Sequence, residues 1–150
     1  MHTTIKRKNE KKLESIYLIG SLRNKKIPEI ATNLRKLGID VFDDWMAAGP
    51  EADDYWKKYE QERGRSYQEA LGGYAANHVF SFDKFHLDRL DAALLVLPAG
   101  KSGHLELGYV AGSGKPTYIL LDEQDIRWDV MYLFATKVFR NEGEMIDYFN

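Results

Sequence analysis

Cysteine is absent from the 150-residue chain. This excludes disulfides, thiolate chemistry and cysteine-bound zinc; it also suits a reducing compartment, so we expect a cytoplasmic protein. Long apolar runs are absent as well. None approaches the roughly 20 residues needed to cross a bilayer, so no membrane partner is expected. The basic opening "MHTTIKRKNEKK" has no apolar segment behind it and does not predict a signal peptide. We expect residues 1–14 to form a flexible, solvated basic tail.

A strong excess of either charge is also missing. The chain has 21 Lys and Arg against 23 Asp and Glu, a formal net charge of −2, which does not predict a nucleic acid polymer as a partner. The chain has four histidines, and none of them shows metal-binding spacing: His2, His78, His86 and His104. Asp43-Asp44 and Asp53-Asp54 specify no third ligand, so caps and solvated turns explain them better than magnesium. Neither a metal nor a cofactor is expected.

Short apolar runs alternate with helical patterns along the chain. Strands are predicted over residues 15–20, 39–45, 92–98, 116–121 and 136–140. Helices are predicted over residues 28–38, 52–76, 83–90, 103–114 and 142–149. This alternation predicts one α/β domain over residues 15–150, with about five mostly parallel strands and helices on both faces. The long polar and aromatic segment after the second strand is the expected place of a binding site.

The Gly100-Lys101-Ser102 stretch follows a predicted strand and precedes a predicted helix, as in a Walker phosphate loop. That loop requires a glycine five residues before the Gly-Lys pair, where this chain has Leu95. Gly114-Lys115 fails the same test, because Tyr109 stands at the required place. What remains is a glycine-bearing turn that opens a helix. Its free N–H groups and the positive end of the helix dipole could hold an anion.

Glu106 allows two interpretations, and the residues around it do not decide between them. It either compensates the helix dipole, which is worth roughly 0.3–1 kcal/mol, or it is a nucleophile whose pKa the dipole lowers. Tyr17, in the first predicted strand, could donate its hydroxyl to this carboxylate. Asp83 is expected to begin a short helix, either as an N-cap or as a substrate ligand. His104 is by default a surface or packing residue.

Three segments together, "IYLIGSLRN", "FDKFHLDRLDAALLVLP" and "SGHLELGYVAGSGKP", resemble the nucleoside 2-deoxyribosyltransferase superfamily. This superfamily includes deoxynucleoside 5′-monophosphate N-glycosidases, and the resemblance covers most of residues 15–121. It implies a Rossmann-like or flavodoxin-like domain that forms a homodimer or a higher homo-oligomer. It also implies an enzyme that cleaves or exchanges the N-glycosidic bond of a nucleoside 5′-monophosphate or a nucleoside, by hydrolysis or by base transfer.

The resemblance implies catalytic roles for three residues. Glu106, within a Glu-Leu-Gly stretch, would attack the anomeric carbon and form a covalent glycosyl-enzyme. Tyr17 would position Glu106. Asp83 would contact the base or help to protonate it.

One position departs from the family pattern. Gly100 stands where the nucleoside transferases have an aspartate that binds the sugar hydroxyl. Monophosphate-cleaving members have small and hydroxyl-bearing residues there, so a 5′-monophosphate is the preferred substrate. The expected substrate-binding residues are Gly20, Ser21, Arg23, Lys101, Ser102, Gly103 and His104. Two alternatives remain: a non-catalytic module that binds or senses nucleotide derivatives and, less favoured, an NAD-type glycohydrolase.

Overall fold

The computed structural model describes residues 12–124 and 127–150. In these residues one sheet has the strand order β2-β1-β3-β4-β5. The strands are β1 (Ser15–Ile19), β2 (Asp40–Phe42), β3 (Ala93–Val96), β4 (Thr117–Leu120) and β5 (Lys137–Phe139). Every neighbouring pair is parallel, so the predicted α/β architecture is confirmed, with the strand order of flavodoxin-like folds. The predicted basic tail lies, over residues 1–11, outside the described residues.

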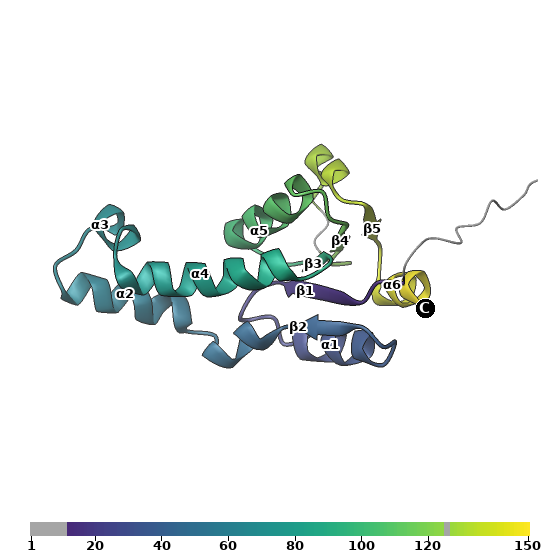
Figure 1. Cartoon of the computed structure of the whole chain (residues 1–150), viewed down its shortest axis with the longest axis horizontal. Helices are drawn as coiled ribbons and strands as arrows, with labels where there is room; N and C mark the ends of the chain where they lie inside the picture. The colour runs from purple at the N-terminus through teal and green to yellow at the C-terminus, as the bar shows by residue number, and fades with distance from the viewer. Residues whose placement is uncertain (1–11, 125–126) are drawn as a thin grey trace, which may run out of the picture.

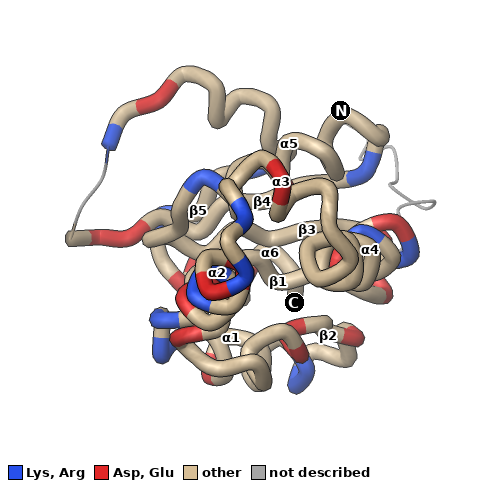
Figure 2. The backbone as a smooth tube through the Cα atoms, turned by 90° about the vertical axis from the view of Figure 1, so that its left-hand side faces the viewer, with Lys and Arg blue, Asp and Glu red and all other residues tan. Residues whose placement is uncertain are grey.

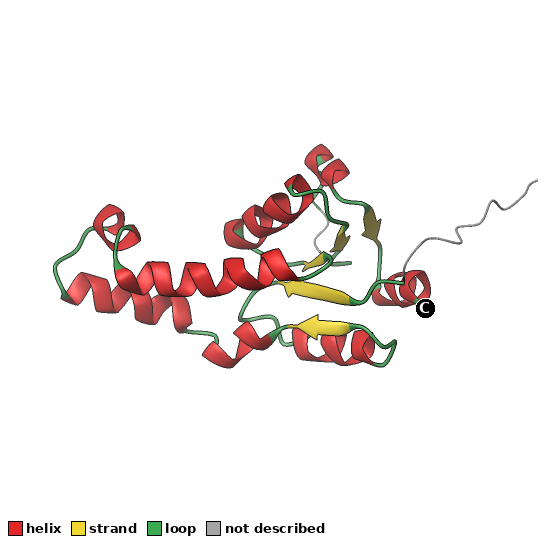
Figure 3. Ribbon diagram, in the orientation of Figure 1, coloured by secondary structure: helices red, strands yellow, loops and turns green. Residues whose placement is uncertain are grey.

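Helices cover both faces of the sheet, as predicted (Figure 1, Figure 3). The helices that pack on one face are α1 (Ile27–Arg35) and α6 (Glu142–Phe149), and those on the other face are α4 (Tyr74–Arg89) and α5 (Lys101–Gly112). Successive side chains of a strand point to opposite faces. In β1, Ile16 and Leu18 therefore enter the first core, and Tyr17 and Ile19 enter the second.

The segment between β2 and β3 differs from its prediction. The helix predicted over residues 52–76 is divided into α2 (Ala52–Glu62) and α3 (Tyr67–Leu71). Gly64, at φ +74°, turns the chain between them, a conformation that favours glycine. Ser66 then starts α3 with a capping box, in which its side chain and that of Glu69 each bond the other residue's backbone N–H.

Helix α4 is longer than predicted and corrects the expectation for Asp83. Its 16 residues include residues 77–82, which lie between the two predicted helices. Asp83 lies in the middle of α4, so the N-cap interpretation is wrong. Figure 1 shows α2, α3 and the first half of α4 projecting away from the sheet, and we call residues 52–82 the helical arm.

Two 3-10 turns complete the described elements, η1 (Asp44–Ala48) and η2 (Val130–Phe134). The strand predicted over residues 39–45 ends at Phe42, because η1 begins directly afterwards. Basic and acidic residues are interleaved along α2, and the strand centres are uncharged (Figure 2). Among the described residues no helix is both long enough and apolar enough to cross a membrane.

Close packing explains two glycines, Gly20 directly after β1 and Gly103 in the first turn of α5. A Cβ added at Gly103 would lie 3.1 Å from Ile19 Cγ2 and 3.2 Å from Leu95 Cδ1. A Cβ at Gly20 would lie 2.7 Å from Ile27 Cδ1. The missing side chains therefore let α5 approach β1 and β3, and let α1 approach the end of β1.

Candidate active site

The candidate site lies where β1 and β3 are neighbours at the centre of the sheet. Tyr17 projects from β1 on the face covered by α4 and α5, and it pairs in register with Ala93 of β3. Beyond β3 the chain turns into α5, which begins at Lys101. Strand order reverses between β1 and β3, and ligands of open α/β sheets bind in the crevice at such a point.

Helical spacing turns Glu106 toward the sheet. The buried residues of α5 are Gly103, Leu107 and Val110, and residues three or four apart share a helix face. Glu106 stands three residues after Gly103 and four before Val110, so its side chain lies along the margin of this face. The carboxyl is largely buried, and its Oε2 atom has no hydrogen-bond partner among the described residues.

Burial decides the protonation of Glu106. Loss of solvent raises the pKa of its carboxyl from the ordinary 4.5 to about 7. Hydrogen bonding from the Tyr17 hydroxyl opposes part of that rise, and the negative charge of Asp83 adds to it. The expectation that this pKa is lowered is wrong, because burial is the largest effect on it and raises it.

The other two predicted catalytic residues adjoin Glu106. The pKa of Tyr17 is raised by burial first, and then by the charges of Glu106 and Asp83. The pKa of Asp83 is raised by burial and by the nearby carboxylate of Asp53. Three titratable groups from β1, α4 and α5 therefore share one poorly solvated place. Perturbed groups of this kind cluster at functional sites, although their roles here stay a prediction.

Two loops at the carboxyl edge hold most of the predicted phosphate-binding residues. In the loop after β1, Ser21 Oγ accepts a hydrogen bond from the Arg23 backbone N–H at 3.1 Å. The Arg23 guanidinium is exposed and forms an ion pair with Asp54 of α2 at 3.1 Å. After β3, Lys101 and Ser102 occupy the exposed first turn of α5. Gly20, in the loop after β1, and Gly103, in the first turn of α5, are explained by the packing described above.

His104 faces away from this group. Its Nδ1 atom bonds the Gly100 carbonyl oxygen at 2.8 Å, and its Nε2 atom bonds the Tyr132 hydroxyl at 2.9 Å. The His104 ring also stacks on Tyr132, with centroids 5.8 Å apart. Tyr132 belongs to η2, so the structure joins His104 to η2 and does not bring it together with Tyr17 and Glu106.

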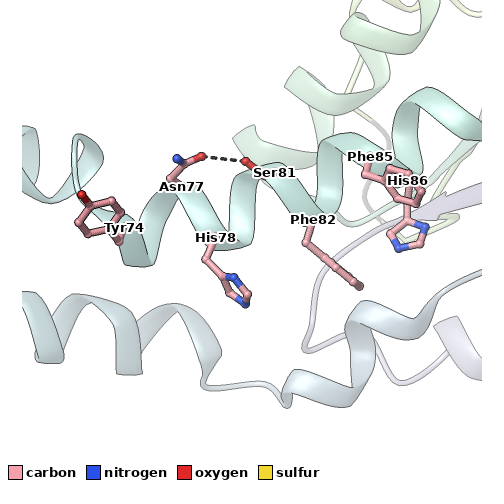
Figure 4. A pocket seen from close by; sticks show the side chains of 7 residues that line it. All are labelled: Tyr74, Asn77, His78, Ser81, Phe82, Phe85 and His86. Carbon is pink, nitrogen blue, oxygen red and sulfur yellow. Dashed lines mark hydrogen bonds between the residues drawn. The ribbon is translucent and has the colours of Figure 1, made fainter.

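An aromatic groove along α4 was not among the features predicted from the sequence. The groove has a volume of about 690 Å³ and is lined by residues of α4: Tyr74, Asn77, His78, Ser81, Phe82, Phe85 and His86. Figure 4 shows Phe82 and His86 pointing to the same side of α4. His86 stacks on Phe42 at 3.9 Å between centroids. The spacing of residues 74, 78 and 82 at every fourth position indicates one helical face, but residues 77–82 lie between the two predicted helices.

Replacing Glu106 by glutamine tests its burial. In the folded chain the pKa of the Glu106 carboxyl is about 7, whereas its ordinary value is 4.5. Rising pH between these values therefore favours the unfolded chain, which binds fewer protons. We expect Glu106→Gln to match the wild type near pH 4.5 and to be more stable by roughly 1–3 kcal/mol at pH 8. Urea unfolding at both pH values measures the difference.

The matched control is Glu144→Gln. An ion pair with Arg140 lowers the pKa of Glu144, so this variant should lose stability, not gain it, above pH 5. Equal stability of Glu106→Gln and the wild type at pH 4.5 and at pH 8 would contradict the burial of this carboxyl.

Two solved structures are similar to this chain in fold. A 2-deoxyribosyltransferase from the psychrotolerant bacterium Bacillus psychrosaccharolyticus superposes with a TM-score of 0.61 at 18% identity, over 89% of this chain and 91% of that one. A CMP N-glycosidase from Clostridium botulinum superposes with a TM-score of 0.55 at 13% identity, over 90% and 97%. No protein-family model matches the chain, and no curated protein sequence matches it significantly. The chain therefore shares its fold, over nearly its whole length, with a 2-deoxyribosyltransferase and a CMP N-glycosidase.

Proposed function

We propose that this protein cleaves or exchanges the N-glycosidic bond of a nucleoside 5′-monophosphate or a nucleoside, with Glu106 as the nucleophile. The observation that carries the proposal is the Glu106 carboxyl itself. It is largely buried at the β1–β3 crevice, Tyr17 and Asp83 flank it, and one of its oxygens has no hydrogen-bond partner within the part of the chain that the structure describes. The shared fold with a deoxyribosyltransferase and a CMP N-glycosidase supports this reaction class.

The proposed chemistry uses the two carboxyl groups differently. The ionised Glu106 oxygen bonds to the anomeric carbon while the N-glycosidic bond breaks and its electron pair goes to the base. Asp83 would donate a proton to the departing base; burial first, and then Asp53, raise its pKa, which brings this carboxyl closer to the working range of a general acid. Water or a second base then attacks the anomeric carbon and releases Glu106, as in retaining glycoside hydrolysis.

Tyr17 is proposed as a positioning residue. Burial and the neighbouring carboxylates raise its pKa, so its hydroxyl keeps its proton at neutral pH. That hydroxyl can donate to Glu106 and favour the ionised, nucleophilic form. The raised pKa of Glu106 leaves a substantial ionised fraction near pH 7, which is enough for a nucleophile that needs no separate base.

The other parts of the substrate fit the neighbouring loops and the groove. Ser21, Arg23, Lys101 and Ser102 would surround the 5′-phosphate from the loops after β1 and β3, with Arg23 as its bidentate partner. The aromatic groove along α4 would hold the base, since aromatic side chains stack on nucleobases.

Release of free base tests the reaction and separates it from the binding alternative. The substrates are the nucleoside and deoxynucleoside 5′-monophosphates and their nucleosides, with and without an acceptor base, and the products are separated by chromatography. We expect Glu106→Ala to lower base release or exchange by about 10³-fold or more, because the nucleophile is lost, while substrate binding persists.

Glu14→Gln, an exposed carboxylate just before β1, is the control and should keep full activity. If the wild type binds these ligands but no base is released or exchanged under any acceptor condition, the non-catalytic binding module is the correct function. Base release from NAD alone would favour the glycohydrolase alternative.

Replacing Arg23 tests the phosphate cradle. We expect Arg23→Ala to weaken kcat/KM for 5′-monophosphates by about 10- to 100-fold, since a charge-assisted hydrogen bond is worth roughly 1.5–3 kcal/mol. The matching nucleosides should change little. Lys25→Ala removes an exposed cation from the same loop and is the control. Equal losses for nucleotides and nucleosides would remove the cradle from the proposal.

We further propose that the protein assembles with copies of itself through α4. Four large apolar residues of α4 are exposed: Val79, Phe80, Phe82 and Phe85. Phe80 and Phe82 are two residues apart and so point to opposite sides of the helix. Large exposed apolar side chains grouped on one helix are typical of protein interfaces. A second copy of the chain is the proposed cover.

Light scattering on a sizing column tests the assembly. We expect the wild type to have at least twice the chain mass of 17.3 kDa, and Phe80→Glu to shift it toward the monomer, because a charge would be buried in an apolar interface. Thr32→Glu adds the same charge to an exposed position of α1 and should leave the mass unchanged. A monomeric wild type would overturn this part of the proposal.

A further inference from the structure

The guanidinium proposed to bind phosphate already has an anionic partner. Arg23 Nη2 donates to Asp54 Oδ2 at 3.1 Å, although the two residues are 31 positions apart in the chain. Both side chains remain about two-thirds exposed, at 68% and 66%. Asp54 stands in the first turn of α2, so the helical arm places a carboxylate on the loop that follows β1.

We infer that Asp54 is a specificity-determining residue, which competes with the 5′-phosphate of the substrate for Arg23. This inference rests on the proposed function. A carboxylate and a phosphate bind a guanidinium through the same charge-assisted hydrogen bonds. The phosphate carries about −1.5 to −2 charges and three acceptor oxygens near pH 7, whereas the carboxylate carries one charge and two oxygens. A phosphate dianion therefore displaces Asp54, and weaker anions do so less readily.

The exposure of the pair makes this exchange possible. Exposed ion pairs contribute little to stability, so breaking the Arg23–Asp54 bond does not unfold the loop or the helix. The buried residue of α2 is Glu60, and its ion pairs with Arg63 and Arg65 lie within the helical arm. The start of α2 is thus free to release Arg23 while the arm stays folded.

The neighbouring carboxylate faces a different part of the site. Asp53 acts on Asp83 and raises its pKa, whereas Asp54 holds Arg23. In the first turn of α2, Asp53 therefore acts on the proposed proton donor. The next residue, Asp54, binds the arginine that is proposed to bind the phosphate. This makes Asp53 a matched control for Asp54, since the two residues carry the same charge in the same helical turn.

Binding measurements in a chain that cannot turn over its substrate test the competition. In the Glu106→Gln background, calorimetry compares the four deoxynucleoside 5′-monophosphates with the four matching deoxynucleosides. We expect Asp54→Asn to lower the Kd for monophosphates about three- to tenfold, because both a competing ion pair and a like charge are removed. The Kd for deoxynucleosides should stay unchanged, and so should that for monophosphates, within about twofold, in Asp53→Asn.

A double substitution tests whether the tighter binding of monophosphates depends on the Arg23 guanidinium. In Arg23→Ala, adding Asp54→Asn should no longer tighten monophosphate binding by more than about twofold, because the group for which the anions compete is gone. Asp54→Ala is measured in parallel, so that the result does not depend on the asparagine side chain.

Each outcome decides the inference. If monophosphates bind and Asp54→Asn leaves their Kd unchanged or raises it, the role of Asp54 is wrong while the proposed function stands. The same conclusion follows if Asp53→Asn tightens binding equally, or if the gain persists in Arg23→Ala. If neither monophosphates nor deoxynucleosides bind, both the inference and the proposed function are overturned.

Discussion

The direct parallel pairing of β1 with β3 is the constraint on which the site depends. The two strands are neighbours in the sheet although the chain between them contains β2 and most of the helices. The loop after β1 leads to α1 on one face, and the loop after β3 leads to α5 on the other. A crevice is left where they diverge. Tyr17 of β1 and Glu106 of α5 come together here from segments that are distant in sequence.

Close packing of α5 on this pair of strands also sets the chemistry of Glu106. Gly103 allows the helix to approach Ile19 and Leu95, and the same approach removes solvent from the carboxyl three residues later. Burial of that carboxyl raises its pKa to about 7 and opposes folding at neutral pH. A carboxylate that destabilises the fold while one oxygen is unpartnered is typical of a site kept for function.

The helical arm is the part of this architecture that projects away from the sheet (Figure 1). Its contacts with the rest of the chain include a few charged and aromatic side chains. Asp53 and Asp54 reach the site from α2, while Phe82 and His86 line the groove from α4. In the proposed function the sheet holds Glu106 as the nucleophile, and the arm would supply the surroundings of the base and the phosphate and the contact with a second copy of the chain.

The sequence by itself determined the order of the strands and helices, because buried strands and amphipathic helices leave apolar patterns that are local. It also placed Tyr17 in a strand and Glu106 in a helix, and the spacing around Gly100 excluded a Walker loop. Only the tertiary structure decided the continuous helix around Asp83 and the raised pKa of Glu106. It alone decided the pairing of Arg23 with Asp54. Burial and contacts between distant segments depend on how the elements pack, and no local pattern records that packing.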